Sequence, residues 1–309
     1  MYNDTIKVAN KIITSEELME IFELMNEKLV YYKKINDREE INNRMLDYRY
    51  QNWTFKDSSS KIKFEVDFYD NTNIMIDNYN NFITIFNNRL EEIKRIHVYF
   101  YLTYEIRLEG QKSEFYSQHI FLSISENNMD IDISLSSNDN KLNDLYELIK
   151  SKVLNAKPKY DEIIKKRSLI KTIIGLALGF IPALVLTTIL IFVPTIREIY
   201  AQSYVIYPIA SLFLAFFIGN TIGSFKLDRY YKYIIPEQKY VGYDSNSKSS
   251  IYKDDVDKFI STSEILIGKN TNNLKCREQI KQYKEKYKKW LPYEFGVLII
   301  ISIIVLFLG

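Results

Sequence analysis

Apolar residues follow two kinds of pattern in this chain, periodic in the first half and continuous in the second. Three continuous runs stand out, at Leu169–Val193, Val205–Phe225 and Leu291–Gly309. About 20 apolar residues are enough for a helix to cross the hydrocarbon core of a bilayer. The runs therefore predict three transmembrane helices, with the first two forming a hairpin in residues 161–225 around an external connection at 194–204.

The third run is the weakest of the three. Its strictly apolar part is Gly296–Leu308, and a start at Leu291 places Glu294 near the membrane surface. Pro292 suits the first turn of a new helix, where its missing N–H costs nothing. We predict a C-terminal transmembrane anchor at 291–309 after a break at Pro292, or alternatively a helix that enters only one leaflet.

Basic residues beside the runs predict the orientation, because Lys and Arg collect on the cytoplasmic side of membrane proteins. The basic residues expected at the membrane surface are Lys165, Lys166, Arg167, Lys284, Lys286, Lys288 and Lys289. The N-terminus and residues 226–290 are then cytosolic. We expect a multi-pass protein of a bacterial inner membrane, with its C-terminus at the outer face.

Each of the first two runs contains a GxxxG pattern. Gly175 and Gly179 form the first, and Gly219 and Gly223 form the second. Small residues allow the backbones of two helices to approach closely. The glycines predict helix packing within the hairpin, with contact between chains or chance occurrence as the alternatives.

The first 160 residues alternate between helical and strand periods. Thr14 and Glu17 have the spacing of a capping box, which predicts a helix at 15–34. The other predicted helices are 38–46, 80–93 and 141–154, and the predicted strands are 61–67, 74–76, 97–108, 115–125 and 129–135. This order predicts an α+β cytosolic domain over residues 1–160, with an antiparallel sheet and helices on one face. The other face is expected to be solvated or open to a partner.

Residues 226–290 are expected to form a second cytosolic segment. Tyr240–Tyr252 is rich in Ser, Asn and Asp, and indicates a loop or a short hairpin. Asn273–Lys289 has helical spacing and many lysines, which suit either contact with anionic lipid headgroups or a solvated helix.

Composition restricts the chemistry. The chain has 309 residues and a net charge of +2, so no global basic field for nucleic acid exists and no nucleic-acid partner is expected. The single cysteine, Cys276, excludes an internal disulfide and a cysteine-based zinc site. The frequent Asn, Ile and Lys suit an AT-rich bacterial genome.

No motif of a phosphate loop, dinucleotide fold, hydrolase or metalloprotease is present, and no motif links the chain to a known family. His97 and His119 belong to the polar sets of two predicted strands and could be neighbours. Asp130 and Asp132 flank Ile131, where they could hold a divalent cation or simply solubilise a strand. We expect no catalytic residue, no metal and no cofactor.

These observations favour an integral membrane protein that displays a non-enzymatic sensing, scaffolding or regulatory domain. Its expected partners are the lipid bilayer and an unidentified cytosolic protein or small ligand, with further copies of itself in a homo-oligomer as another candidate. One alternative is a membrane-disrupting effector whose spans assemble into a pore on a cytosolic signal. Another is a membrane-anchored enzyme that uses the histidines and carboxylates of the sheet face.

Overall fold

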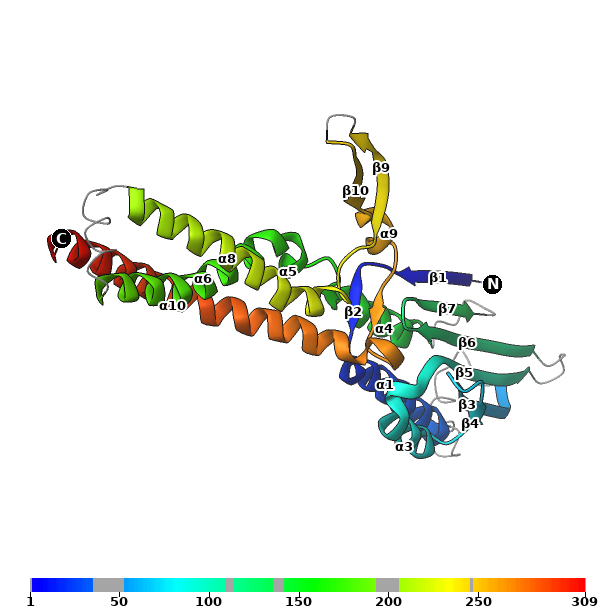
Figure 1. Ribbon diagram of the computed structural model, residues 1–309. Helices are drawn as coiled ribbons and strands as arrows, with labels where there is room; N and C mark the ends of the chain where they lie inside the picture. The colour runs from blue at the N-terminus through cyan, green and yellow to red at the C-terminus, as the bar shows by residue number, and fades with distance from the viewer. Residues whose placement is uncertain are drawn as a thin grey trace. The chain divides into compact units, whose positions relative to one another are not determined.

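The computed structural model describes residues 2–35, 53–108, 114–135, 142–192, 206–244 and 247–308 (Figure 1). The chain divides into two compact units. The sheet unit comprises residues 1–160 and 236–272, and the helical unit comprises residues 161–235 and 273–309.

The sheet unit is built on a six-stranded antiparallel sheet with the order β1-β7-β6-β5-β3-β4. Its strands are β1 (Tyr2–Val8), β3 (Trp53–Phe68), β4 (Asn73–Ile76), β5 (Ile93–Leu108), β6 (Glu114–Ser125) and β7 (Met129–Leu135). Each of the strands predicted from alternation is present, and the predicted α+β class with an antiparallel sheet is confirmed.

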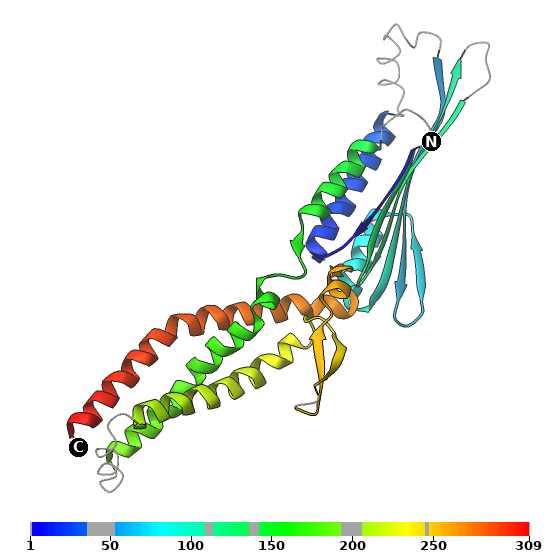
Figure 2. The same cartoon turned by 90° about the horizontal axis from the view of Figure 1, so that it is seen from above.

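Among the described residues, three helices bury one face of this sheet. They are α1 (Ser15–Ile35), α3 (Tyr79–Arg89) and α4 (Asn143–Asn155), and Figure 2 shows α1 and α4 along the same face. The predicted capping box opens α1, since Thr14 N–H donates to Glu17 Oε2 at 2.8 Å and Glu17 N–H donates to Thr14 Oγ1 at 3.2 Å. The predicted helix at 38–46 lies outside the described residues.

Aromatic rings fill the core where α1 and α3 meet β3. Phe64 of β3 stacks on Phe82 of α3 with ring centroids 3.9 Å apart, and Phe22 of α1 meets Phe82 edge-to-face at 5.0 Å. All three side chains are fully buried. Such pairs add about 0.5–1.5 kcal/mol each beyond the area that they bury.

Residues 236–272 join the sheet unit through a small second sheet. In this sheet β2 (Lys11–Ile13) pairs in parallel with β11 (Glu264–Ile265) and antiparallel with β8 (Lys157–Pro158). The same segment carries 3-10 helix η2 (Gly268–Asn272). It also holds a separate two-stranded hairpin of β9 (Gln238–Asp244) and β10 (Ser249–Asp254), at the position where a loop or short hairpin is predicted.

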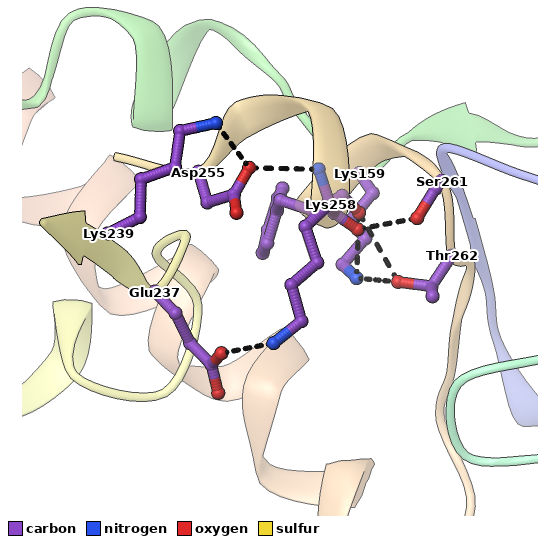
Figure 3. Close-up of polar contacts among 8 residues, drawn as sticks. Lys159, Glu237, Lys239, Asp255, Lys258, Ser261 and Thr262 are labelled. Carbon is purple, nitrogen blue, oxygen red and sulfur yellow. Dashed lines mark hydrogen bonds and ion pairs between the residues drawn. The ribbon is translucent and has the colours of Figure 1, made fainter. Parts of the chain in front are cut away.

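A buried lysine fastens this segment at short helix α9 (Val256–Ile260). Lys159, 7% exposed, donates from Nζ to the Phe259 carbonyl at 3.2 Å and to Thr262 Oγ1 at 2.9 Å (Figure 3). Its ammonium also lies 4.2 Å from the centre of the Phe259 ring. A buried charge needs such partners, since leaving it unpaired would be costly.

Gly268 fastens the same segment to the turn between β6 and β7. Its φ of +55° suits glycine, and an added Cβ would lie 2.5 Å from the Ile93 carbonyl oxygen and 2.6 Å from Glu126 Oε1. The Glu126 carbonyl accepts from Ile265 N–H at 2.9 Å and from Asn270 Nδ2 at 2.8 Å. Glycine at position 268 therefore serves close packing.

The described residues of the helical unit form four helices with a shared apolar core. They are α5 (Glu162–Lys165), α6 (Arg167–Phe192), α8 (Ile206–Tyr231) and α10 (Asn273–Leu308). Ile170 and Ile174 of α6 are buried with Leu227 and Tyr231 of α8 and with Ile280 of α10. Arg277 of α10, 5% exposed at its side chain, forms an ion pair at 3.0 Å with Asp161, which caps α5.

In the part of the chain that the structure describes, no helix combines the length and the apolar content needed to cross a membrane. The transmembrane helices predicted at 169–193, 205–225 and 291–309 are therefore wrong for these residues, and so is the multi-pass inner-membrane location that rested on them. The physical reason is that an apolar run also serves as the seam of packed helices. Ile170, Ile174 and Leu227 occupy such a seam.

The predicted helix break at Pro292 is also wrong. Pro292 lies inside α10, which continues from Asn273 to Leu308. A proline removes one backbone hydrogen bond and can be accommodated within a long helix, although it costs stability there.

Glycines set the approach of α6 and α8. A Cβ on Gly175 would lie 2.5 Å from the Gly219 carbonyl oxygen, and a Cβ on Gly223 would lie 2.7 Å from the Gly175 Cα. The Gly179 Cα would lie 3.1 Å from a Cβ on Gly219. A Cβ on Gly223 would also lie 2.8 Å from the Lys171 carbonyl oxygen. Later residues of α8 thus lie against earlier residues of α6, so the two helices run antiparallel. All four glycines of the GxxxG patterns thus lie at one backbone contact within the chain.

We expect Gly175→Ala to destabilise the helical unit by about 1–3 kcal/mol, because the new methyl group can be accommodated only if the backbones separate. Thermal unfolding followed by circular dichroism measures the effect. Gly296→Ala in α10 is the matched control, since a Cβ there meets nothing within 4 Å. Equal stability of the two variants would contradict this account of the seam.

Candidate functional site

The face of the six-stranded sheet opposite α1, α3 and α4 is the candidate site, and we call it the open face. Side chains alternate between the two faces of a strand, so each strand contributes a buried set and an open set. Ile62, Phe64 and Val66 of β3 are buried beneath the helices, whereas Lys61 and Lys63, which alternate with them, are exposed. No helix covers the open face among the described residues of this unit (Figure 2).

An aromatic band occupies the middle of the open face. It consists of His97, Tyr99 and Tyr101 of β5 and His119 and Phe121 of β6. The strand register places Tyr99 opposite Phe121 and Tyr101 opposite His119. Ring centroids are 4.9 Å apart for Tyr99 and Phe121, 5.5 Å for His97 and Phe121, and 6.1 Å for Tyr101 and His119. Tyr101 is the most open of these, at 37% exposure.

Charged side chains flank the aromatic band on both sides. The cations of the open face are Lys7, Lys61, Lys63 and Arg95, and its carboxylates are Glu65, Asp67, Asp130 and Asp132. These described charges sum to zero. The described side chains of the open face therefore show no basic excess of the kind that a nucleic-acid surface requires.

Hydrogen bonds hold the β3 carboxylates and Tyr99 in place. Asn73 Nδ2 donates to Glu65 Oε1 at 2.8 Å and to Asp67 Oδ1 at 2.7 Å. Tyr99 O–H donates to Glu65 Oε2 at 3.3 Å. Burial, followed by the negative charge of Glu65, raises the pKa of Tyr99, so this hydroxyl stays protonated as a donor.

His97 is held neutral at physiological pH. Burial lowers its pKa, and the nearby Arg95 guanidinium lowers it further, against the smaller opposing effects of Glu65 and Asp67. Its ring lies nearly parallel to that of Phe121, with an interplanar angle of 16°. Its Nδ1 atom is buried and has no hydrogen-bond partner among the described residues. His97 therefore serves the open face as a flat, uncharged ring.

The two histidines share a face but are not neighbours. His119 lies opposite Tyr101, whereas His97 lies opposite Ser123, and Phe121 separates the two along β6. Asp130 and Asp132 project from β7 beside them, and the described residues contain no group of three or more potential metal ligands. The arrangement provides no histidine pair for acid–base chemistry.

The remaining sequence candidates lie in the helical unit. Lys165, Lys166 and Arg167 surround the junction of α5 and α6, and Lys166 pairs with Glu162 at 2.6 Å. Lys284, Lys286, Lys288 and Lys289 follow one another along α10, and Cys276 packs near its start with a half-buried side chain. The helical unit also exposes large apolar side chains, among them Phe213, Phe217, Ile300 and Ile303.

A cavity of about 300 Å³ lies between α1, β2 and α4. Its polar lining is already engaged, since Glu17 Oε2 accepts from Thr14 N–H and Glu20 pairs with Lys152 at 2.6 Å. The cavity offers a ligand fewer available groups than the open face does.

Comparison of the chain with protein-family models, with curated proteins and with solved structures gives no match. Function is therefore inferred from the residues of this chain alone.

Sequence reasoning identified His97, His119 and the carboxylates but missed the aromatic band. Tyr99, Tyr101 and Phe121 occupy positions that alternate with the buried set, where polar residues are expected. Three aromatic residues at outward positions of two adjacent predicted strands are the signal that could have revealed it.

The lowered pKa of His97 predicts a pH-dependent stability. The unfolded chain binds a proton at His97 with a pKa near 6.5, more tightly than the folded protein does. The stabilisation that comes from keeping His97 neutral should therefore be fully present above about pH 6.5 and should decrease as the pH falls below it. Thermal unfolding at about pH 7.5 and about pH 5.5 should show a smaller loss for His97→Gln than for the unsubstituted protein. His119→Gln is the control, and an unchanged loss in His97→Gln would contradict the assignment.

Proposed function

We propose that this protein is a non-enzymatic binding protein with a scaffolding, sensing or regulatory role, and that its open face binds another protein. The aromatic band at the centre of that face is the observation that carries the proposal. Aromatic residues are enriched in protein–protein interfaces, because they bury a large area and lose little conformational entropy.

The flanking charges support a protein partner rather than a polyanion. Cations and carboxylates are equally numerous on the described part of the open face, so a nucleic acid would meet as much repulsion as attraction. A protein surface of mixed charge can match both signs. The carboxylates also add specificity, because a partner with misplaced charges is rejected.

The enzyme alternative has weaker support. Its two histidines are separated by Phe121, and the lowered pKa of His97 favours a neutral ring packed against its neighbours. The pore-forming alternative rested on the predicted transmembrane helices, and the described residues offer no observation in its favour.

Photo-crosslinking tests the proposal in the cell. A photoreactive amino acid at position 101, in the aromatic band, should form protein adducts. The same group at position 148 on α4 is the control, because Leu148 is 51% exposed but lies on the helical side of the sheet. The captured protein is then purified, and its affinity for the chain is measured by calorimetry.

We expect Tyr99→Ala with Phe121→Ala to weaken that affinity by about tenfold or more, while Leu148→Ala leaves it unchanged. The proposal is overturned if both positions give equal adducts or if the adducts contain nucleic acid. It is also overturned if the double substitution leaves the affinity unchanged.

A further inference from the structure

The charges along β3 have an unusual order. Its open-face residues are Lys61, Lys63, Glu65 and Asp67, two cations followed by two carboxylates. Such an order is complementary to itself when reversed. An antiparallel copy of the strand would place each lysine over a carboxylate.

These charges do not neutralise one another within the chain. Among the described residues, no ion pair involves Lys61 or Lys63, and both lysines are exposed. In the part of the chain that the structure describes, Glu65 and Asp67 accept hydrogen bonds only from the neutral groups of Asn73 and Tyr99, although the register places the Arg95 cation of β5 opposite Asp67. Both ends of the charge series therefore remain available to a partner.

We propose that the partner of the open face is a second copy of this chain, packed sheet to sheet with its strands antiparallel to those of the first. The inference rests on the proposed function and names its partner. The two-fold axis crosses the strands between the row of Lys63, Tyr99 and Phe121 and the row of Glu65, His97 and Ser123. Lys63 then meets Glu65 of the second copy, and Lys61 meets Asp67 of the second copy.

The same axis brings part of the aromatic band against the second copy's rings and cations. Tyr99 meets the neutral ring of His97 of the second copy. Tyr101 meets Arg95 of the second copy, a cation–π contact. Because a two-fold interface repeats every contact, the dimer contains two copies of each.

The size of the open face suits such an interface. Five strands about 4.8 Å apart and seven residues about 3.3 Å apart cover roughly 24 by 23 Å. Corrugated by side chains, this area is of the order of the ~800 Å² per partner that stable complexes bury. On β7 the same axis brings Asp132 over Asp130 of the second copy, a repulsive contact that Lys7, opposite Asp130 in the register, partly offsets.

Charge reversal tests the arrangement on the full chain by sedimentation velocity over a wide range of concentration. An acidic variant carries Lys61→Glu and Lys63→Glu, and a basic variant carries Glu65→Lys and Asp67→Lys. Each alone brings like charges together, so its self-association should weaken by about tenfold or more. A mixture of the two should associate again.

A variant with all four substitutions gives the most specific test of the charge order. Its charge order is inverted but again self-complementary, so it should dimerise like the unsubstituted chain. Lys281→Glu with Lys289→Glu on α10 is the control for charge alone, because both lysines are exposed and lie outside the open face. Circular dichroism verifies that each variant is folded.

A monomeric unsubstituted chain overturns the inference, as does a dimer that the acidic and basic variants leave intact. Failure of the fourfold variant to dimerise, when the unsubstituted chain does, also overturns it. Photo-crosslinking at position 101 separates this failure from that of the proposed function. Adducts with a different protein leave the binding role standing and exclude the second copy, whereas adducts of the chain with itself support both.

Discussion

Burial of one face of the six-stranded sheet is the constraint on which the rest of the sheet unit depends. Side chains alternate with a period of two, so a slip of one residue in any strand would turn its apolar set toward water. The helices α1, α3 and α4 make that slip costly, because Phe64, Val98 and Ile131 are fully buried beneath them. The order of residues on the open face is thereby determined by packing on the other side.

In the helical unit, by contrast, the packing depends on glycines, which have no side chain. At Gly175, Gly219 and Gly223 the backbones of α6 and α8 touch directly, and no larger residue fits. Farther along, ordinary apolar packing takes over through Ile170, Leu227 and Tyr231, and α10 adds Ile280. Close approach at the glycines and interdigitation at the larger residues together determine how these helices pair.

Local pattern was sufficient to predict the elements with strong periodicity. The helix from Ser15, the strand pair at β3 and β4 and the hairpin of β6 and β7 are all present, because each has an apolar face that only one period explains. β2, β8 and β11 were not predicted. They are two or three residues long, and they depend on partners far away in the sequence, so no local pattern marks them.

The site was only partly predictable for a related reason. Alternation identified the open face, but the prediction treated its outward residues as a generic polar set. Tyr99, Tyr101 and Phe121 become a band only through the register of β5 on β6, which depends on the buried face. The apolar runs of the second half were misread because hydropathy does not reveal whether a residue faces another helix.

The connectivity of the two units has a consequence for biosynthesis. The chain passes between the sheet unit and the helical unit after Tyr160, after Ile235 and after Asn272. A ribosome therefore synthesises α6 and α8 before β11 and Gly268. The residues that β11 and its neighbours contact, β2 and Glu126, are synthesised much earlier. The sheet unit cannot mature as a nascent N-terminal module. Its last strand, β11, is synthesised late. Until then, one edge of β2 is unpaired and can bind chaperones or mispair with another strand.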